Sequence, residues 1–246
     1  MSSDEIKKYG KWMYEFELGN GIKTPLYVDS LREVHDVRHS MIFSFLDSVC
    51  FDYKYNCVLD IACNEGYFTF EMLKRGCNFG LGVEARAENI EKAIFIKRTL
   101  QYQNCDFKQG DIFDVDISSE FGVVLLLGII YHVENPLGLL RKAASLTSKF
   151  LFVETQLCQS GHKIPFGRGT PNQYSQGGSY FVLHHEKDEQ NPLASIGGFS
   201  LVPNLSAIVE ILRELGFQSV IQLHPNRQVQ EFQYNNVDRT ILVGIK

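Results

Sequence analysis

The sequence predicts an α/β domain with a mostly parallel sheet, helices on both faces and an antiparallel last strand. From Cys57 to Val153, short and almost wholly apolar runs alternate with amphipathic segments. This alternation is typical of a parallel sheet that is covered on both faces. The last fifth of the chain differs, because one helical segment is followed by two strands joined by a polar loop. That pattern indicates an antiparallel pair at the edge of the sheet.

The elements follow one another without an internal repeat or a low-complexity tract. Apolar residues at helical spacing predict a first helix over residues 30–50, ahead of the sheet. Seven strands are expected, over residues 58–61, 79–83, 105–108, 121–127, 150–153, 220–223 and 240–245. The helices between and after them are expected over residues 67–75, 87–102, 136–146 and 204–215.

Length and composition are those of a single globular domain over residues 1–246, with 44% hydrophobic and 22% charged residues. Residues 1–50 form an N-terminal cap segment and helix. Residues 155–202 are rich in glycine and fit no regular element. A connection of this length in a compact domain is usually functional or disordered. We therefore interpret it as an insertion over the active site, at the carboxyl edge of the sheet.

Several function classes are disfavoured by composition. The net charge of −5 argues against a broad basic surface for nucleic acid. No apolar run is long enough for a membrane span, and the first residues lack a signal core, so we expect a cytoplasmic protein. None of the six cysteines forms a C-x-x-C pair, so we expect reduced and mostly buried thiols. His35 and His39 are expected on a solvated helix face, and no metal site is expected.

The strongest local signal is the turn that joins the first strand to the next helix. Ala62, Asn64 and Gly66 are small or tolerate left-handed backbone, so a ligand can approach the main chain there. Ligands of open parallel sheets bind beyond the carboxyl ends of the strands. The turn has one glycine and the acidic Glu65, which disfavours a pyrophosphate and suits a positively charged ligand.

Acidic residues end three successive strands, at Asp60, Glu84 and Asp111. A carboxylate at Glu84 can accept hydrogen bonds from both ribose hydroxyls of a nucleoside. Asp111 could meet an adenine amino group, with Ile112 stacked on the ring. The alternative is that each acid only caps the following helix. Their ordered recurrence favours a nucleoside site.

The sequence resembles class I S-adenosylmethionine-dependent methyltransferases, and more narrowly the tRNA wobble-uridine 5-oxyacetate-pathway enzymes and their single-domain relatives. The segments that carry the resemblance are Leu59-Asp60-Ile61-Ala62-Cys63-Asn64-Glu65-Gly66-Tyr67-Phe68, Leu127-Gly128-Ile129-Ile130-Tyr131-His132, Asn135-Pro136-Leu137, Val153-Glu154-Thr155 and Val202-Pro203-Asn204. The resemblance implies a Rossmann-like fold with a seven-stranded sheet and S-adenosyl-L-methionine as cofactor. It places Asp60, Asn64 and Gly66 along the methionine and sugar, and Leu127 beside the sulfonium. It gives Glu84, Asp111 and Ile112 the ribose and adenine roles stated above.

The carboxymethyl-transferring members of that family hold the extra carboxylate of a carboxylated cofactor with a lysine, a tyrosine and an arginine. Lys23, Tyr131 and Arg239 occupy the matching positions, and Arg38 matches a further basic residue. The resemblance therefore also allows carboxy-S-adenosyl-L-methionine as cofactor. The chain departs from the family after Tyr-His, where Val133-Glu134 replaces an arginine. Its acidity and the short segment before the first core helix disfavour tRNA as substrate.

Tyr131 and His132 are the candidate catalytic residues, because they follow a strand at its carboxyl end. His132 is the candidate base, since an unperturbed imidazole titrates at about 6.5, and Tyr131 could orient the acceptor. Three interpretations stay open. The chain is a methyltransferase for a hydroxyl or amine of a small molecule or nucleoside, a carboxymethyltransferase for a nucleoside or tRNA, or a non-catalytic nucleoside-binding protein.

Overall fold

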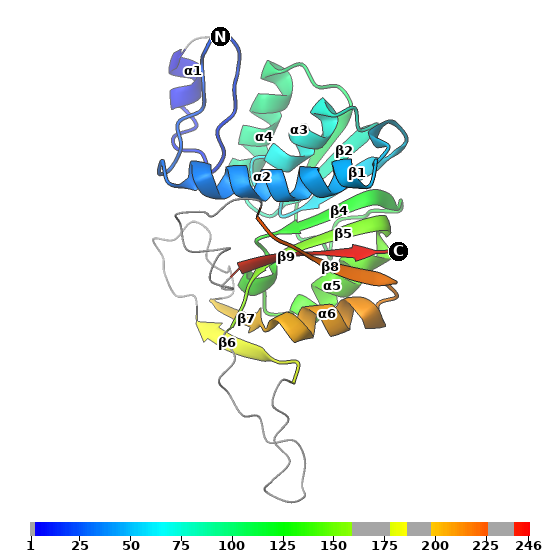
Figure 1. Cartoon of the computed structure of the whole chain (residues 1–246). Helices are drawn as coiled ribbons and strands as arrows, with labels where there is room; N and C mark the ends of the chain where they lie inside the picture. Colours follow the sequence, from blue (N-terminus) through cyan, green and yellow to red (C-terminus); the bar gives the residue numbers. More distant parts are fainter. Residues whose placement is uncertain (1–2, 159–177, 186–197, 226–238) are drawn as a thin grey trace, which may run out of the picture.

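A seven-stranded sheet forms the centre of the computed structural model, which describes residues 3–158, 178–185, 198–225 and 239–246 (Figure 1). The strand order is β3-β2-β1-β4-β5-β9-β8. The bounds are β1 (Cys57–Ile61), β2 (Phe79–Glu84), β3 (Cys105–Gln109), β4 (Phe121–Leu127), β5 (Thr147–Gln156), β8 (Ser219–Leu223) and β9 (Arg239–Ile245). Neighbours from β3 to β5 pair in parallel, and β9 runs antiparallel to both β5 and β8. The predicted fold class is confirmed.

Helices cover both faces of the sheet because side chains alternate along each strand. On β1, Val58 packs into one buried core and Leu59 into the other. The first core lies under α2 (Leu31–Ser48), α3 (Tyr67–Lys74) and α4 (Ala87–Thr99). The second lies under α5 (Pro136–Ser145) and α6 (Leu205–Glu214). There are two single-turn 3-10 helices, η1 (Tyr53–Tyr55) and η2 (Ile130–His132), and the second contributes the buried Ile130 and Tyr131.

The predicted antiparallel pair at the sheet edge is confirmed, with β8 outermost and β9 between β5 and β8. One expectation about the later part of the chain needs correction. Residues 155–202 do contain regular structure. Strand β5 continues to Gln156, and β6 (Phe181–His185) pairs with β7 (Phe199–Pro203) in a separate two-stranded sheet. Residues 159–177 and 186–197 of this insertion lie outside the described part, and its placement over the active site stays a prediction.

A buried carboxylate, that of Glu65, helps to hold the N-terminal segment against the sheet domain. After the short helix α1 (Ser3–Lys7), the chain makes β-bridges between Trp12 and Leu26 and between Glu17 and Lys23. The Glu65 carboxylate accepts the backbone N–H groups of Met13 and Tyr14 at 2.9 and 3.0 Å. It also lies 3.2 Å from the Lys92 ammonium. Glu65 therefore faces the N-terminal segment, which corrects its expected place beside the ligand.

The expectations for the cysteines and histidines are confirmed only in part. All six cysteines are free, and three of them are buried. The solvated helix face expected for the histidines is wrong for His35, which is buried on α2 and stacks on Tyr14 with ring centroids 4.1 Å apart. His39 lies 3.1 Å from the Glu71 carboxylate. Within the described ranges, no helix has the length and apolarity that crossing a membrane would require.

Candidate active site

The turn between β1 and α3 brings the main chain close to any ligand at the end of β1. Ala62, Asn64 and Gly66 all have left-handed backbone, with φ values of 57°, 51° and 80°. A Cβ on Gly66 would lie 2.5 Å from the Phe107 ring, so only glycine fits there. The side-chain oxygen of Asn64 is buried, and no donor among the described residues hydrogen-bonds to it. Of the three turn residues, Ala62 lines the cavity described below, whereas Asn64 and Gly66 do not.

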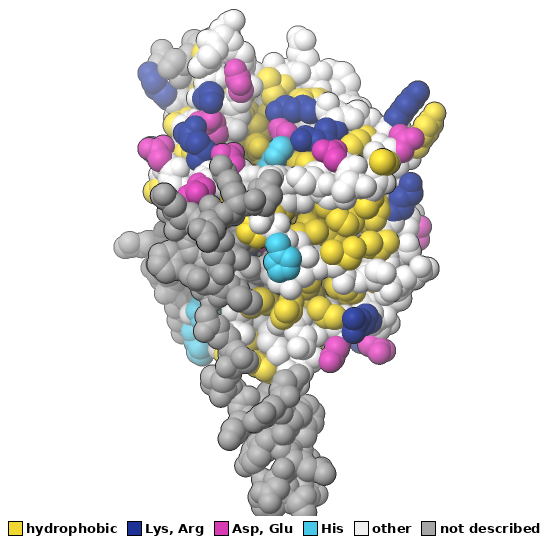
Figure 2. Space-filling model, in the orientation of Figure 1, with side chains coloured by type: hydrophobic (Ala, Val, Ile, Leu, Met, Phe, Trp, Pro, Cys, Tyr) yellow, Lys and Arg dark blue, Asp and Glu magenta, His cyan; other side chains and the backbone are white. Residues whose placement is uncertain are grey.

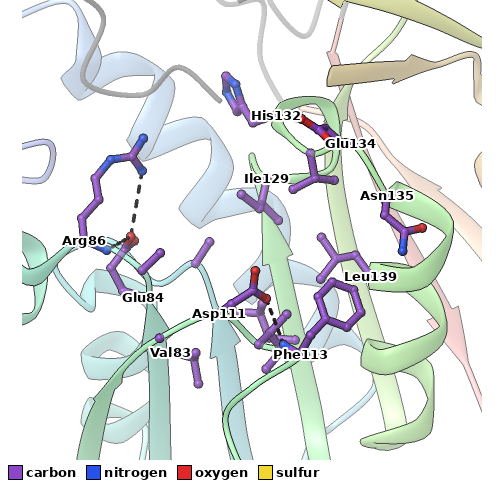
Figure 3. A pocket seen from close by; sticks show the side chains of 16 residues that line it. Val83, Glu84, Arg86, Asp111, Phe113, Ile129, His132, Glu134, Asn135 and Leu139 are labelled. Carbon is purple, nitrogen blue, oxygen red and sulfur yellow. Dashed lines mark hydrogen bonds and ion pairs between the residues drawn. The ribbon is translucent and has the colours of Figure 1, made fainter. Parts of the chain in front are cut away.

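A cavity of about 420 Å³ opens at the carboxyl ends of β1, β2 and β4 (Figure 3). This volume is within the usual range for small-molecule sites, which is about 300–1,000 Å³. Its charged and aromatic lining includes Glu84, Arg86, Asp111, Phe113, His132 and Glu134. Three carboxylates against one guanidinium among the described lining residues favour a ligand with positive charge.

Glu84 ends β2 and is almost fully buried at one side of the cavity. Its carboxylate accepts the backbone N–H of Asn64 at 3.0 Å and that of Arg86 at 2.9 Å. The Arg86 guanidinium lies 3.9 Å away (Figure 3). Glu84 therefore ties the β1–α3 turn to the end of β2. The alternative interpretation was that Glu84 only caps the following helix. Glu84 also holds the β1–α3 turn, so it does more than cap a helix.

Asp111 and Ile112 line the same cavity, after β3. Asp111 is exposed and accepts the backbone N–H of Phe113 at 2.9 Å, so one carboxylate oxygen is occupied by a local turn. Ile112 is buried, while Phe113 is nearly half exposed. The pair thus presents a carboxylate next to an apolar wall, as an adenine site requires.

Asp60 lies behind the cavity and is not part of its lining. The buried carboxyl of Asp60 accepts the Thr69 hydroxyl at 3.1 Å. Burial raises the pKa of Asp60 from 3.8 to about 7, while hydrogen bonds from Thr69 and the charge of Arg38 lower it. Leu127 is half-buried at the end of β4 and does not line the cavity either.

A second group of polar residues, which we call the β5 ion cluster, consists of Tyr14, Arg38, Tyr131, Glu154 and Arg239. Glu154 is fully buried on β5, and its Oε1 lies 2.9 Å from Arg38 Nη2 and 3.3 Å from Arg239 Nη1. Arg38 Nη1 donates to the Tyr14 hydroxyl at 2.7 Å. The Arg239 guanidinium lies 5.1 Å from the centre of the Tyr131 ring. Arg239 is thus buried, not exposed on an edge strand.

Lys23 is placed differently from the other predicted carboxylate-binding residues. Its side chain is about half exposed and pairs with Glu15 at 2.8 Å in the N-terminal segment. The structure therefore brings Tyr131, Arg239 and Arg38 into one cluster, while Lys23 contacts Glu15. His132 lines the cavity beside the cluster, and its ring lies 4.1 Å from that of Tyr131.

Comparison with known proteins agrees with the fold. Residues 54–169 match the family model described as "Methyltransferase domain". The N-terminal domain of EvdMO1 with SAH bound superimposes with a TM-score of 0.73 at 19% identity, covering 100% of this chain and 97% of that one. Magnesium protoporphyrin IX methyltransferase (ChlM) from Synechocystis PCC 6803 with bound SAH gives 0.56 at 14% identity, covering 89% and 85%. Residues 54–169 thus match a methyltransferase domain, and the whole described fold is that of these SAH-bound proteins.

Curated relatives of this methyltransferase domain carry the name tRNA U34 carboxymethyltransferase. The protein of that name from Desulfotalea psychrophila is 26% identical over 170 residues, covering 69% of this chain and 47% of the relative. The one from Campylobacter jejuni subsp. jejuni is 25% identical over 169 residues, covering 66% and 55%. The chain spans about half the length of these relatives. The resemblance to class I methyltransferases is confirmed.

The sequence did not reveal the residues of the β5 ion cluster whose contacts are with residues far away in the chain. Glu154 was noted as part of a motif, but no role was assigned to it, and Tyr14 was not noted. Their partners lie 24 to 116 positions away in the chain, so no local spacing reveals them. One signal was available for Glu154, because a carboxylate in the apolar run of β5 must find a cationic partner.

Proposed function

We propose that the chain is an S-adenosylmethionine-dependent methyltransferase whose acceptor is a hydroxyl or amine of a small molecule or nucleoside. The observation that carries this proposal is the acidic cavity at the carboxyl ends of β1, β2 and β4, with Glu84 on one side and Asp111 and Ile112 on another. The methyltransferase domain and the fold of its neighbours support it.

The residues of the cavity fit the parts of such a cofactor. The Glu84 carboxylate can accept the ribose hydroxyls, and Asp111 can accept the adenine amino group beside Ile112. Asn64 and Gly66 do not line the described cavity, so contacts between this turn and the methionine end stay a prediction. The shortage of basic groups in the lining suits a cation and disfavours a diphosphate.

When bound, S-adenosylmethionine supplies a sulfonium-activated methyl group for in-line displacement. The protein contributes alignment, which can be worth roughly 7–11 kcal/mol in reactions of this kind. His132 lines the cavity next to Tyr131, so its imidazole is the candidate acceptor of the proton that the substrate loses. The Tyr131 hydroxyl stays protonated, since burial raises its pKa, but Tyr131 does not line the described cavity, so its role in orienting the acceptor stays a prediction.

Carboxymethyl transfer is the second candidate, and the approach of Arg239 to Tyr131 favours it. Arg38 adds a further guanidinium to the same place, and curated relatives bear the name tRNA U34 carboxymethyltransferase. The pairing of Lys23 with Glu15 and the pairing of both guanidiniums with Glu154 weigh against it.

Mass spectrometry of small molecules released from the purified protein tests the proposal. We expect S-adenosylmethionine or its demethylated product, and calorimetry should give tighter binding of the plain cofactor than of the carboxylated one. Tighter binding of carboxy-S-adenosylmethionine would establish the second candidate instead. Absence of binding to either would leave a non-catalytic protein on a methyltransferase fold.

A further inference from the structure

One wall of the cavity is formed by the segment that joins β4 to α5. The residues of this wall segment that line the cavity are Ile129, His132, Val133, Glu134 and Asn135. In Figure 3, the labelled residues of the wall lie across the cavity from Glu84 and Arg86. The wall carries His132, the candidate base, so the place of this imidazole depends on what holds the segment.

Both ends of the wall segment are held by local hydrogen bonds. At its start, the His132 N–H donates to the Ile129 carbonyl at 2.9 Å. At its end, Asn135 caps α5, and its side-chain oxygen accepts the Gly138 N–H at 2.9 Å. Within the described chain, neither Val133 nor the next residue makes a backbone hydrogen bond inside the segment. The middle of the wall therefore depends on a partner from elsewhere in the chain.

That partner is β7, in the small two-stranded sheet. The Leu201 N–H donates to the Val133 carbonyl at 3.2 Å. The strand is itself anchored at its end, where the Pro203 carbonyl accepts the N–H of Cys158, two residues after β5, at 2.9 Å. Directly after β7, the Asn204 side chain caps α6. A strand that is tied to the end of β5 and to α6 thus holds the middle of the cavity wall.

The hydrogen bond to Val133 uses the side of β7 that faces away from β6. In an antiparallel pair, opposed residues alternate between those that exchange hydrogen bonds and those that do not. The Asn204 N–H donates to the Tyr180 carbonyl at 3.0 Å. Leu183 and Leu201 are opposed three steps further along the register, so they form a pair of the other kind. The Leu201 N–H therefore points to the wall and the Leu183 N–H to the opposite edge, and neither contributes to the ladder.

We propose that Leu201 is a positioning residue whose backbone N–H holds the cavity wall that carries His132, so that cofactor binding is coupled to the placement of β7. This inference rests on the proposed function, in which the cavity holds S-adenosylmethionine. A displacement of about 1 Å near a reacting centre can cost on the order of 100-fold in rate. The coupling is reciprocal, because a change that loosens β7 from Val133 weakens cofactor binding, and bound cofactor strengthens that contact by the same factor.

Leu201→Pro removes this N–H and leaves the ladder with β6 intact. Calorimetry on the full chain should show binding of S-adenosylhomocysteine, the demethylated product of the cofactor, weakened by about three- to tenfold, as expected for one backbone hydrogen bond. Leu201→Ala keeps the N–H, so its affinity should fall less. Leu183→Pro is the matched control, since it makes the same change in the opposed residue, whose N–H lies on the other edge. It should bind as the wild type does.

Hydrogen exchange followed by nuclear magnetic resonance tests the coupling in the wild-type chain without any substitution. The Leu201 amide proton exchanges when its hydrogen bond to Val133 opens. Because the open state binds the ligand more weakly, saturating S-adenosylhomocysteine should slow this exchange by about the same three- to tenfold. The Leu183 amide should exchange at the same rate with and without the ligand.

Exchange at Leu201 that does not respond to saturating ligand would overturn the inference, even if both proline variants failed to fold. Equal losses of affinity in Leu201→Pro and Leu183→Pro, or in Leu201→Pro and Leu201→Ala, would also overturn it, since the small sheet or the side chain would then be responsible. In these cases the ligand still binds and the proposed function stands. Wild-type protein that binds neither S-adenosylmethionine nor its product would overturn the proposed function itself.

Discussion

Glu84 lines the cavity and also holds the backbone segments that form its wall. Its carboxylate holds the N–H groups of Asn64 and Arg86 at the wall of the cavity. In Glu84→Ala, a bound ribose would lose its charged acceptor and the turn would lose its tie to β2. Lost hydrogen bonds to a charged group cost about 1.5–3 kcal/mol. Calorimetry should therefore show cofactor binding weakened by about ten- to hundredfold.

Glu91→Ala is the control for this prediction, since Glu91 is an exposed carboxylate on α4. Its affinity should equal that of the wild type, and far-ultraviolet circular dichroism should match for all three proteins. A folded Glu84→Ala protein with wild-type affinity would remove the ribose assignment.

The buried carboxyl of Asp60 predicts how the folding stability of the cofactor-free protein depends on pH. Burial raises its pKa from 3.8 to about 7. Between these values the folded state binds a proton that the unfolded chain has released, so the Asp60 contribution to stability falls as pH rises through this window. Asp60→Asn removes this contribution. Its stability relative to wild type should rise between pH 4 and pH 7, by at most about 1.4 kcal/mol per pH unit.

Urea unfolding of both proteins across this pH range measures the difference directly. A constant difference between the two stability curves would mean that the Asp60 carboxyl titrates equally in the folded and unfolded states.

Single residues were predictable from the sequence where their role follows from their place on a strand. Glu84, Asp111 and Ile112 line the cavity as their positions at strand ends suggested. Glu65 was misjudged, because its partners in the N-terminal segment lie more than 50 positions away. Hydrogen bonds between distant residues depend on tertiary packing, which no local pattern encodes.

Among the elements, the N-terminal segment depends most on a single side chain. Glu65 is 1% exposed, accepts two backbone N–H groups and pairs with Lys92. In Glu65→Ala these donors stay buried without their acceptor, which should cost roughly 3–5 kcal/mol of folding stability. Trypsin should also cut the first 25 residues faster in this variant, because they carry several lysines that are held against the domain through Trp12 and Tyr14.

Glu120→Ala supplies the comparison for Glu65→Ala, since Glu120 is an exposed carboxylate just before β4. Chemical denaturation and a timed digest should not distinguish it from wild type. If Glu65→Ala behaved in the same way, the segment would be held by its aromatic packing and by its hydrogen bonds to Arg38 and Lys92.

The antiparallel pair of β8 and β9 at the sheet edge was predictable, and the residues of β9 also indicated that it is the inner strand of the pair. From Thr240 to Ile245 the strand is almost continuously apolar, which is typical of a strand covered on both faces and paired on both edges. The outermost strand at this side of the sheet is β8, whose residues are partly buried and partly exposed. Existence and type of the strands were therefore predictable, but their lateral order was not.

For the whole molecule, charge decides which partners suit the surface. Acidic residues outnumber basic ones by 29 to 24. On the described part of the face in Figure 2, positive and negative side chains are interspersed and form no continuous basic stripe. Binding to a nucleic-acid backbone draws its affinity from rows of Lys and Arg that displace counterions. Such rows are not part of this described face.

We therefore expect tRNA to bind weakly, with a dissociation constant above about 1 μM at 150 mM salt, as is typical of nonspecific association. Filter binding of labelled tRNA between 50 and 200 mM salt measures both the affinity and its salt dependence, and methyl transfer to free nucleosides should not require tRNA. Submicromolar binding with a steep salt dependence would contradict this expectation. It would identify tRNA as a ligand and would assign the phosphate contacts to surfaces outside the described part of the face in Figure 2.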